Sequence, residues 1–113
     1  MLLKANTLTK DKEFENVFKL GKSSFDKIIG IKAIENKNKI IRFGILVSTK
    51  ISKKAVERNK IKRQIKDIIR LELEKLKQDR DVVVITLPSI LGKTYQEIQE
   101  SIIKHFKKLG LYK

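Results

Sequence analysis

The chain has 113 residues, 41% of them hydrophobic, which suffices for one domain with one modest core. Lys and Arg number 27 against 13 Asp and Glu, and this net charge of +14 favours nucleic acid over an anionic membrane or an acidic protein as the partner. The absence of cysteine excludes disulfides, thiolate zinc sites and a cysteine nucleophile, and no apolar run reaches the length of a membrane span, so a cytoplasmic protein is expected.

The first predicted element is a helix over about residues 10–20. Phe14, Val17 and Phe18 fall on one face of it, at the spacing of an amphipathic helix. Gly21 is expected to end it. From spacing alone, both phenylalanines are expected to belong to the core.

Three β-branched runs predict strands. The runs at 28–35 and 40–48 flank a turn-like Asn-Lys-Asn-Lys sequence, which predicts that they pair as an antiparallel hairpin. The run at 81–88 is apolar without alternation, as is typical of a strand buried on both faces, and Pro88 ends it.

Two further helices are predicted, at about 53–77 and 94–110. The first has an apolar stripe, and the second begins with a capping box of Thr94 and Glu97. Because a strand, a helix and another strand follow one another, the strands at 40–48 and 81–88 could pair in parallel. The order predicts a single α+β domain with helices packed on a small sheet.

The predicted helix at 53–77 carries an unusual concentration of positive charge. Residues 50–77 hold eleven Lys or Arg and four acids, a net charge of +7, which is half of the chain's total. Asn59, Arg63, Lys66 and Arg70 line up along one side, with Lys62 beside them. A solvated helix face usually alternates charge signs, whereas stacked like charges destabilise a helix unless an anion compensates. Nucleic-acid binding is therefore favoured, without distinguishing RNA from DNA.

The basic run at 58–63 resembles the signature motif of a known protein family. The run Arg58-Asn59-Lys60-Ile61-Lys62-Arg63 is similar to the RNR-x-KR signature of the protein subunit of bacterial ribonuclease P. The segments 14–21, 42–48 and 81–85 also resemble that family's first helix, the strand before its basic loop and its last strand. The resemblance covers almost the whole chain in order.

The resemblance implies a fold and its topology. The family fold is a single-domain α-β-β-β-α-β-α two-layer sandwich with a small mixed sheet and an uncommon left-handed β-α-β crossover. Residues 1–113 would form one RNA-binding domain. A further short strand would then lie near 22–25, where the sequence signal is poor.

The resemblance also implies a function in which the protein does not cut. The family's protein is a subunit of an endoribonuclease holoenzyme whose active site lies in a large RNA. That RNA hydrolyses precursor tRNA, using magnesium bound mainly by the RNA, to produce the mature 5′ end. The protein would bind the catalytic RNA and the precursor's 5′ leader, as a cytoplasmic monomer within the holoenzyme, and would hold no catalytic residue and no metal.

The family's functional residues carry over onto two surfaces. The surface expected to bind the RNA subunit comprises Lys50, Lys53, Lys54, Arg58, Asn59, Lys60, Lys62, Arg63, Lys66 and Arg70. The cleft expected to bind the leader comprises Phe14, Phe18 and Arg42. An aromatic face stacks on any base, which suits leaders of varied sequence.

Two departures from the family pattern stand out. Lys60 occupies a position where Arg is usual, which loses a planar hydrogen-bonding fork and keeps the charge. The strand at 28–35 offers Ile where family members often carry a stacking aromatic.

Two other classes of protein remain as alternatives. One is a non-catalytic structural RNA-binding protein of ribosomal type, which is also small, basic and poor in cysteine. The other is a protein-only enzyme acting on RNA, which would need a cluster of carboxylates or histidines. The lone histidine, His105, shows no partner in the sequence and is expected to be an ordinary surface or core residue.

Overall fold

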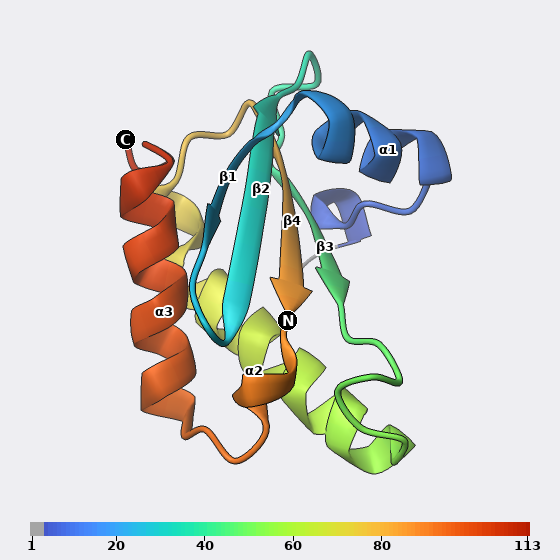
Figure 1. Ribbon diagram of the computed structural model, residues 1–113. Helices are drawn as coiled ribbons and strands as arrows, with labels where there is room; N and C mark the ends of the chain where they lie inside the picture. Colours follow the sequence, from blue (N-terminus) through green and yellow to red (C-terminus); the bar gives the residue numbers. More distant parts are fainter. Residues whose placement is uncertain (1–3) are drawn as a thin grey trace.

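A four-stranded mixed sheet forms the centre of the structure, a computed structural model that describes residues 4–113 (Figure 1). Its spatial order is β1-β2-β4-β3, where the strands are β1 (Lys22–Phe25), β2 (Ile29–Glu35), β3 (Arg42–Leu46) and β4 (Arg80–Thr86). β2 pairs antiparallel with β1 and with β4, whereas β3 pairs parallel with β4. The helices are α1 (Asp11–Leu20), α2 (Ala55–Glu72) and α3 (Tyr95–Lys108), with short 3-10 turns at Lys4–Asn6, Leu73–Lys75 and Pro88–Ile90.

The element order confirms the predicted α-β-β-β-α-β-α arrangement, and β1 is the weakly signalled strand at its expected place. The predicted hairpin between the second and third strands is wrong, because β4 lies between them. Val82, Val83 and Val84 of β4 are all fully buried, and a strand with apolar side chains on both faces is stable at the centre of a sheet, with a neighbour on each side. β4 therefore separates β2 from β3.

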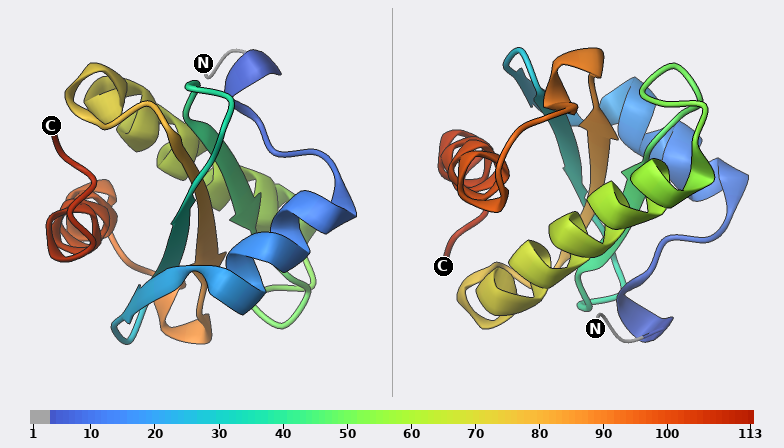
Figure 2. Two further views of the ribbon diagram at one scale, coloured as in Figure 1. Left: turned by 90° about the horizontal axis from the view of Figure 1, so that it is seen from above. Right: turned by 90° about the horizontal axis from the view of Figure 1, so that it is seen from below.

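The connection from β3 through α2 to β4 is a left-handed crossover. β3 and β4 run parallel, and Figures 1 and 2 show α2 on the far side of the sheet from α1. Following the chain from β3 behind the sheet and back to β4 traces a left-handed turn. This agrees with the expected topology and departs from the strong right-handed preference of such units.

The two faces of the sheet are covered unequally. The larger core lies between the sheet and the layer of α2 and α3, and includes Ile31, Phe43 and Val84 from the strands. On the opposite face, where Figure 2 shows α1, there is only a smaller cluster of Leu8, Val17 and Val83. The sheet and the α2–α3 layer are thus the two expected layers, and α1 covers part of the second face.

The C-terminal end of α2 comes earlier than the predicted residue 77. The helix ends at Glu72 and continues as a 3-10 turn. The side-chain amide of Gln78 donates hydrogen bonds to the backbone carbonyls of Leu73, at 3.2 Å, and Leu76, at 2.9 Å. These bonds hold the chain in the turn that follows α2.

Candidate RNA-binding surfaces

The outer side of α2 presents the predicted basic residues to solvent. Ile61, Ile65, Ile68 and Ile69 are buried against the sheet, so the opposite side of the helix must face outward. That side carries what we call the basic face: Asn59, Arg63, Lys66 and Arg70, all exposed.

The cations of the basic face are largely uncommitted. Within residues 4–113, neither Arg63 nor Lys66 makes a side-chain hydrogen bond or ion pair with the protein. Arg70 pairs with Asp67 at 2.9 Å, and both side chains are nearly half exposed. An exposed pair of this kind is weak, so Arg70 can exchange it for a phosphate at little cost.

Arg58 differs from the rest of the signature. Its side chain is half-buried, and its Nη1 donates a hydrogen bond to the backbone carbonyl of Ser52 at 2.9 Å. The loop that it holds carries the exposed Lys50, Lys53 and Lys54. Arg58 therefore shapes the basic loop before α2 in addition to contributing charge.

A hollow of about 190 Å³ lies along the edge strand β3, with α1 on one side of it and one edge of α2 on the other. Lys62 and Lys66 line it together with Phe14 and Gly44. We call it the α1 hollow. It joins the two surfaces that the sequence predicts separately, because α2 cations and an α1 aromatic share its walls.

Phe14 is largely a packing residue. A Cβ placed on Gly44 would come within 2.3 Å of the Phe14 ring, so the ring lies directly over the backbone of β3. The ring also packs against the cluster under α1. Gly44 permits this close approach because it has no side chain.

Phe18 is available to a ligand. Its side chain is 38% exposed, and Nζ of Lys32 lies 5.5 Å from the centre of its ring. An exposed aromatic beside a cation provides both a stacking surface for a base and a charge for a phosphate.

Phe25 is a second exposed aromatic, which the sequence pattern did not single out. Its side chain is 48% exposed, and its ring covers Gly30 of β2 so closely that a Cβ there would lie 2.0 Å away. Gly30 and Lys32 point to the same face of β2, so Phe25 lies on the α1 side of the sheet. It supplies from β1 the aromatic that β2 lacks. Only a confident assignment of the short strand β1, with its register, could have revealed it.

Arg42 holds α1 to the sheet. Its guanidinium donates to both carboxylate oxygens of Asp81, at 2.9 and 2.7 Å, and forms an ion pair with Glu13 of α1. Asp81 is 4% exposed and also accepts from the amide of Asn36 at 2.8 Å. The hydrogen bond to Asp81 is the main cause that raises the pKa of Arg42. The guanidinium is thus already occupied by protein groups, and its expected contact with the leader stays a prediction.

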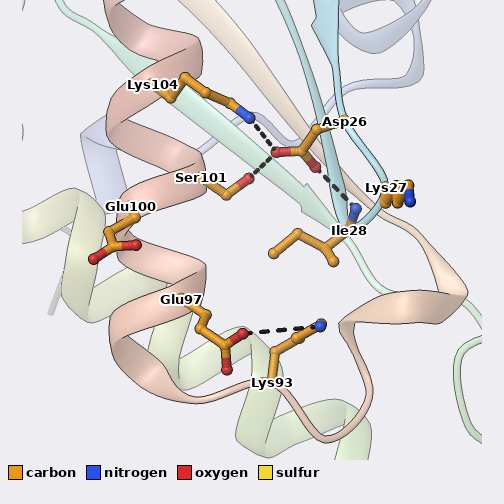
Figure 3. A pocket seen from close by; sticks show the side chains of 8 residues that line it. All are labelled: Asp26, Lys27, Ile28, Lys93, Glu97, Glu100, Ser101 and Lys104. Carbon is orange, nitrogen blue, oxygen red and sulfur yellow. Dashed lines mark hydrogen bonds and ion pairs between the residues drawn. The ribbon is translucent and has the colours of Figure 1, made fainter.

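A larger hollow, of about 490 Å³, lies away from both surfaces, between the β1–β2 turn and α3 (Figure 3). Asp26 on its wall accepts hydrogen bonds from Ser101 at 2.6 Å and from the backbone N–H groups of Ile28 and Ile29, and it pairs with Lys104 at 3.1 Å. Burial acts to raise the pKa of Asp26, but these hydrogen bonds outweigh it and hold the pKa well below its usual range. The contacts tie the turn to α3.

His105 proves to be a core residue with partners. Its ring is fully buried, with Nδ1 hydrogen-bonded to Oγ of Ser24 at 2.7 Å and Nε2 3.2 Å from Oδ2 of Asp26. Burial lowers the pKa of His105 more than the nearby Asp26 raises it. Ser, His and Asp meet here, but a ring with no exposed atom cannot pass a proton to a bound substrate as a catalytic triad requires. The three side chains join β1, the following turn and α3.

Metal-binding clusters and membrane-spanning helices are both missing from the described part of the chain. No group of three or more His, Asp or Glu side chains within residues 4–113 could hold a metal ion. None of the described helices is both long enough and apolar enough to cross a membrane.

Comparison with known proteins gives consistent matches along the chain. The family model described as Ribonuclease P matches residues 2–110. The ribonuclease P protein component of Clostridium botulinum (strain 657 / Type Ba4) is 40% identical over 111 residues, which are 97% of this chain and 99% of that protein.

Solved structures that resemble this fold are proteins of the same family. The RNase P protein of Staphylococcus aureus superposes with a TM-score of 0.89 at 29% identity, covering 97% of this chain and 100% of that one. The RNase P protein of Thermotoga maritima gives 0.78 at 26% identity, covering 87% and 92%. The likeness therefore extends over the sheet and all the helices, well beyond the basic motif.

Proposed function

The chain belongs to the ribonuclease P protein family, and on this premise we propose that it assists an RNA catalyst in removing the 5′ leader of precursor tRNA. It binds the catalytic RNA through α2 and the leader beside α1. It works in the cytoplasm as a monomer within the holoenzyme. The observation that carries this proposal is the α1 hollow, where the cations of α2 and the aromatic side of α1 meet.

The basic face and the basic loop before it bind the RNA subunit. Arg63 and Arg70 present planar forks that match phosphate geometry, and the lysines act as point charges. The amide of Asn59 can hydrogen-bond a base edge or a ribose hydroxyl. Every phosphate neutralised releases counterions, so binding weakens steeply as salt rises.

The leader lies across the α1 side of the sheet. Phe18 and Phe25 offer exposed rings on which bases stack without regard to sequence, and Lys32 stands beside Phe18 to meet a phosphate. Phe14 supports the path from below. Arg42 holds α1 in place, and its contact with the leader stays a prediction.

Magnesium is assigned to the RNA, where it would activate the attacking water and stabilise the charge of the reacting phosphate. The described residues of this chain do not gather the side chains of a protein metal site. What the chain supplies is positive charge at the junction of two RNAs. That charge lowers their mutual repulsion and so lets precursor tRNA bind at modest magnesium concentrations.

The Phe18→Ala variant is expected to weaken binding of precursor tRNA to the holoenzyme by about tenfold, because one base no longer has a ring to stack on. Binding of mature tRNA, which has no leader, should change little. The measurement is the dissociation constant of each tRNA in the same buffer. The Leu20→Ala variant is the matched control, because Leu20 is an exposed apolar residue on the same helix.

Two outcomes would return Phe18 to a packing role. One is an equal loss of affinity for precursor and mature tRNA. The other is a loss of helical signal in circular dichroism, which would mean that the variant no longer folds.

A further inference from the structure

A second hollow lies on the other edge of α2. It has a volume of about 320 Å³, and it separates the first half of α2 from the loop before α3. Its lining includes Glu57, Lys60 and Gln64 from α2 and Ile90, Leu91 and Gly92 from the segment before α3. We call it the α2–α3 groove. Lys60 on this groove and Lys62 on the α1 hollow lie two positions apart, a little more than half a helical turn, so the two hollows flank opposite sides of α2.

Core isoleucines lie at the base of the groove, and polar and charged side chains supply the larger share of its exposed surface. Ile61, Ile90 and Ile98 are 7%, 1% and 1% exposed and belong to the main core. Leu91 on the rim is 41% exposed. At Gly92 no described atom lies within 4 Å of where a Cβ would stand, so this part of the rim is unobstructed.

Polar groups on the groove wall suit the edge of a base. Gln64 is half-buried, and its amide makes no hydrogen bond to the described part of the protein. An amide both donates and accepts, so it can pair with a base edge. Glu57, whose Oε1 accepts from the hydroxyl of Ser52 at 2.7 Å, has a second oxygen to accept from an amino group. Lys60 adds a cation at the rim.

We propose that the α2–α3 groove receives a single unstacked nucleobase of the RNA subunit. Proteins hold a base that has left its stack by packing side chains against its face and hydrogen-bonding its edge, and this groove offers apolar groups at its base and polar groups on its wall. The phosphates that flank this nucleotide would bind Lys60 and Arg63, which lie within about one helical turn of Gln64 on α2. This inference rests on the proposed function, because it needs the basic face to lie on that RNA.

The groove lies on the edge of α2 that faces away from the α1 hollow. This position favours the RNA subunit, rather than precursor tRNA, as the source of the base. The leader is assigned to the α1 side of the sheet, beyond Lys62 and Lys66. A leader nucleotide in the groove would have to cross the whole basic face, which the RNA subunit occupies. A nucleotide of the RNA subunit needs only to turn inward from that face.

The test uses one double variant, which carries both Gln64→Ala and Leu91→Ala. Its affinity for the RNA subunit is compared with that of the wild type. We expect about a tenfold loss of affinity for the RNA subunit, as for one stacked base, and no change in the salt dependence, because the variant removes no cation that meets a phosphate. Dimethyl sulfate probing should show an unpaired adenine or cytosine that the wild-type protein protects and the double variant leaves reactive. Leu71→Ala is the control, because Leu71 is 50% exposed on α2 outside the groove.

Unchanged affinity together with unchanged protection of every nucleotide would overturn the inference. So would a loss confined to precursor tRNA, which would make the leader the occupant. Gln64→Ala alone repeats the test should the double variant lose its fold. The Arg63→Ala variant distinguishes a failure of the groove inference from a failure of the proposed function on which it rests. If Arg63→Ala flattens the salt dependence of RNA binding while the groove variants change nothing, the groove inference fails and the proposed function stands. If Arg63→Ala also changes nothing, the placement of the RNA subunit on the basic face fails as well.

Discussion

Replacing Arg42 with Ala is expected to lower the free energy of unfolding by about 3 kcal/mol, because it leaves the buried carboxylate of Asp81 without its charged partner. The value is at the low end for a buried ion pair, since the Arg42 side chain keeps 18% exposure. The same change releases Glu13, and with it the N-terminal half of α1. Urea unfolding followed by circular dichroism measures the loss.

Two further variants test whether the stranded charge of Asp81, rather than the loss of any arginine, causes this destabilisation. Arg42→Met combined with Asp81→Asn should recover part of the stability, because it removes the stranded charge and keeps the amide contact of Asn36. Arg70→Ala removes an arginine from an exposed pair and should cost well under 1 kcal/mol, as exposed pairs do. If Arg42→Ala proved as stable as Arg70→Ala, the assignment of Arg42 as the tie between α1 and the sheet would be wrong.

Removing two arginines from the basic face should have the largest effect on RNA binding. The double variant Arg63→Ala with Arg70→Ala is expected to bind the RNA subunit at least a hundredfold more weakly at low salt, because each charged hydrogen bond contributes roughly 1.5–3 kcal/mol. The slope of log affinity against log salt should fall by about 2, one for each phosphate that the variant no longer neutralises. Affinities at several salt concentrations give both quantities.

The control for this prediction removes the same charge elsewhere. Lys107→Ala with Lys108→Ala lowers the net charge by two on the exposed end of α3, away from α2's outer side. If net charge alone attracted the RNA, both double variants would lose affinity equally. A larger loss and a flatter slope for the α2 variant would locate the RNA on the basic face. Equal effects would contradict that location.

Local patterns in the sequence predicted most of the elements, and the sheet order was where they failed. The apolar stripe of α2, the capping box of Thr94 and the β-branched run of β4 each depend on neighbouring residues, and each was confirmed. The predicted hairpin failed because strand pairing depends on residues distant in sequence. A short turn between two strands favours a hairpin, and nothing local reveals that β4 will insert between them. The family resemblance, rather than periodicity, implied the left-handed crossover.

In the candidate site, too, features that depend on neighbouring residues were predicted, and features that depend on residues distant in sequence were not. The outward placement of Arg63, Lys66 and Arg70 follows from helical geometry, and the structure places them there. The occupied state of Arg42 could not be inferred, because its partners Glu13 and Asp81 come from distant segments. Phe25 and the partners of His105 were missed for the same reason. The weak strand β1 gave no register from which either contact could be deduced.

Reconstitution tests the central claim most directly. The purified protein would be mixed with the cognate ribonuclease P RNA and a precursor tRNA at a few millimolar magnesium, and removal of the 5′ leader measured against the RNA alone and the protein alone. We expect the protein to raise cleavage strongly in the presence of the RNA and to cut nothing without it. Cleavage no faster than with the RNA alone would contradict the proposed function and favour a structural RNA-binding protein of ribosomal type. Cleavage by the protein alone would contradict an RNA-borne active site.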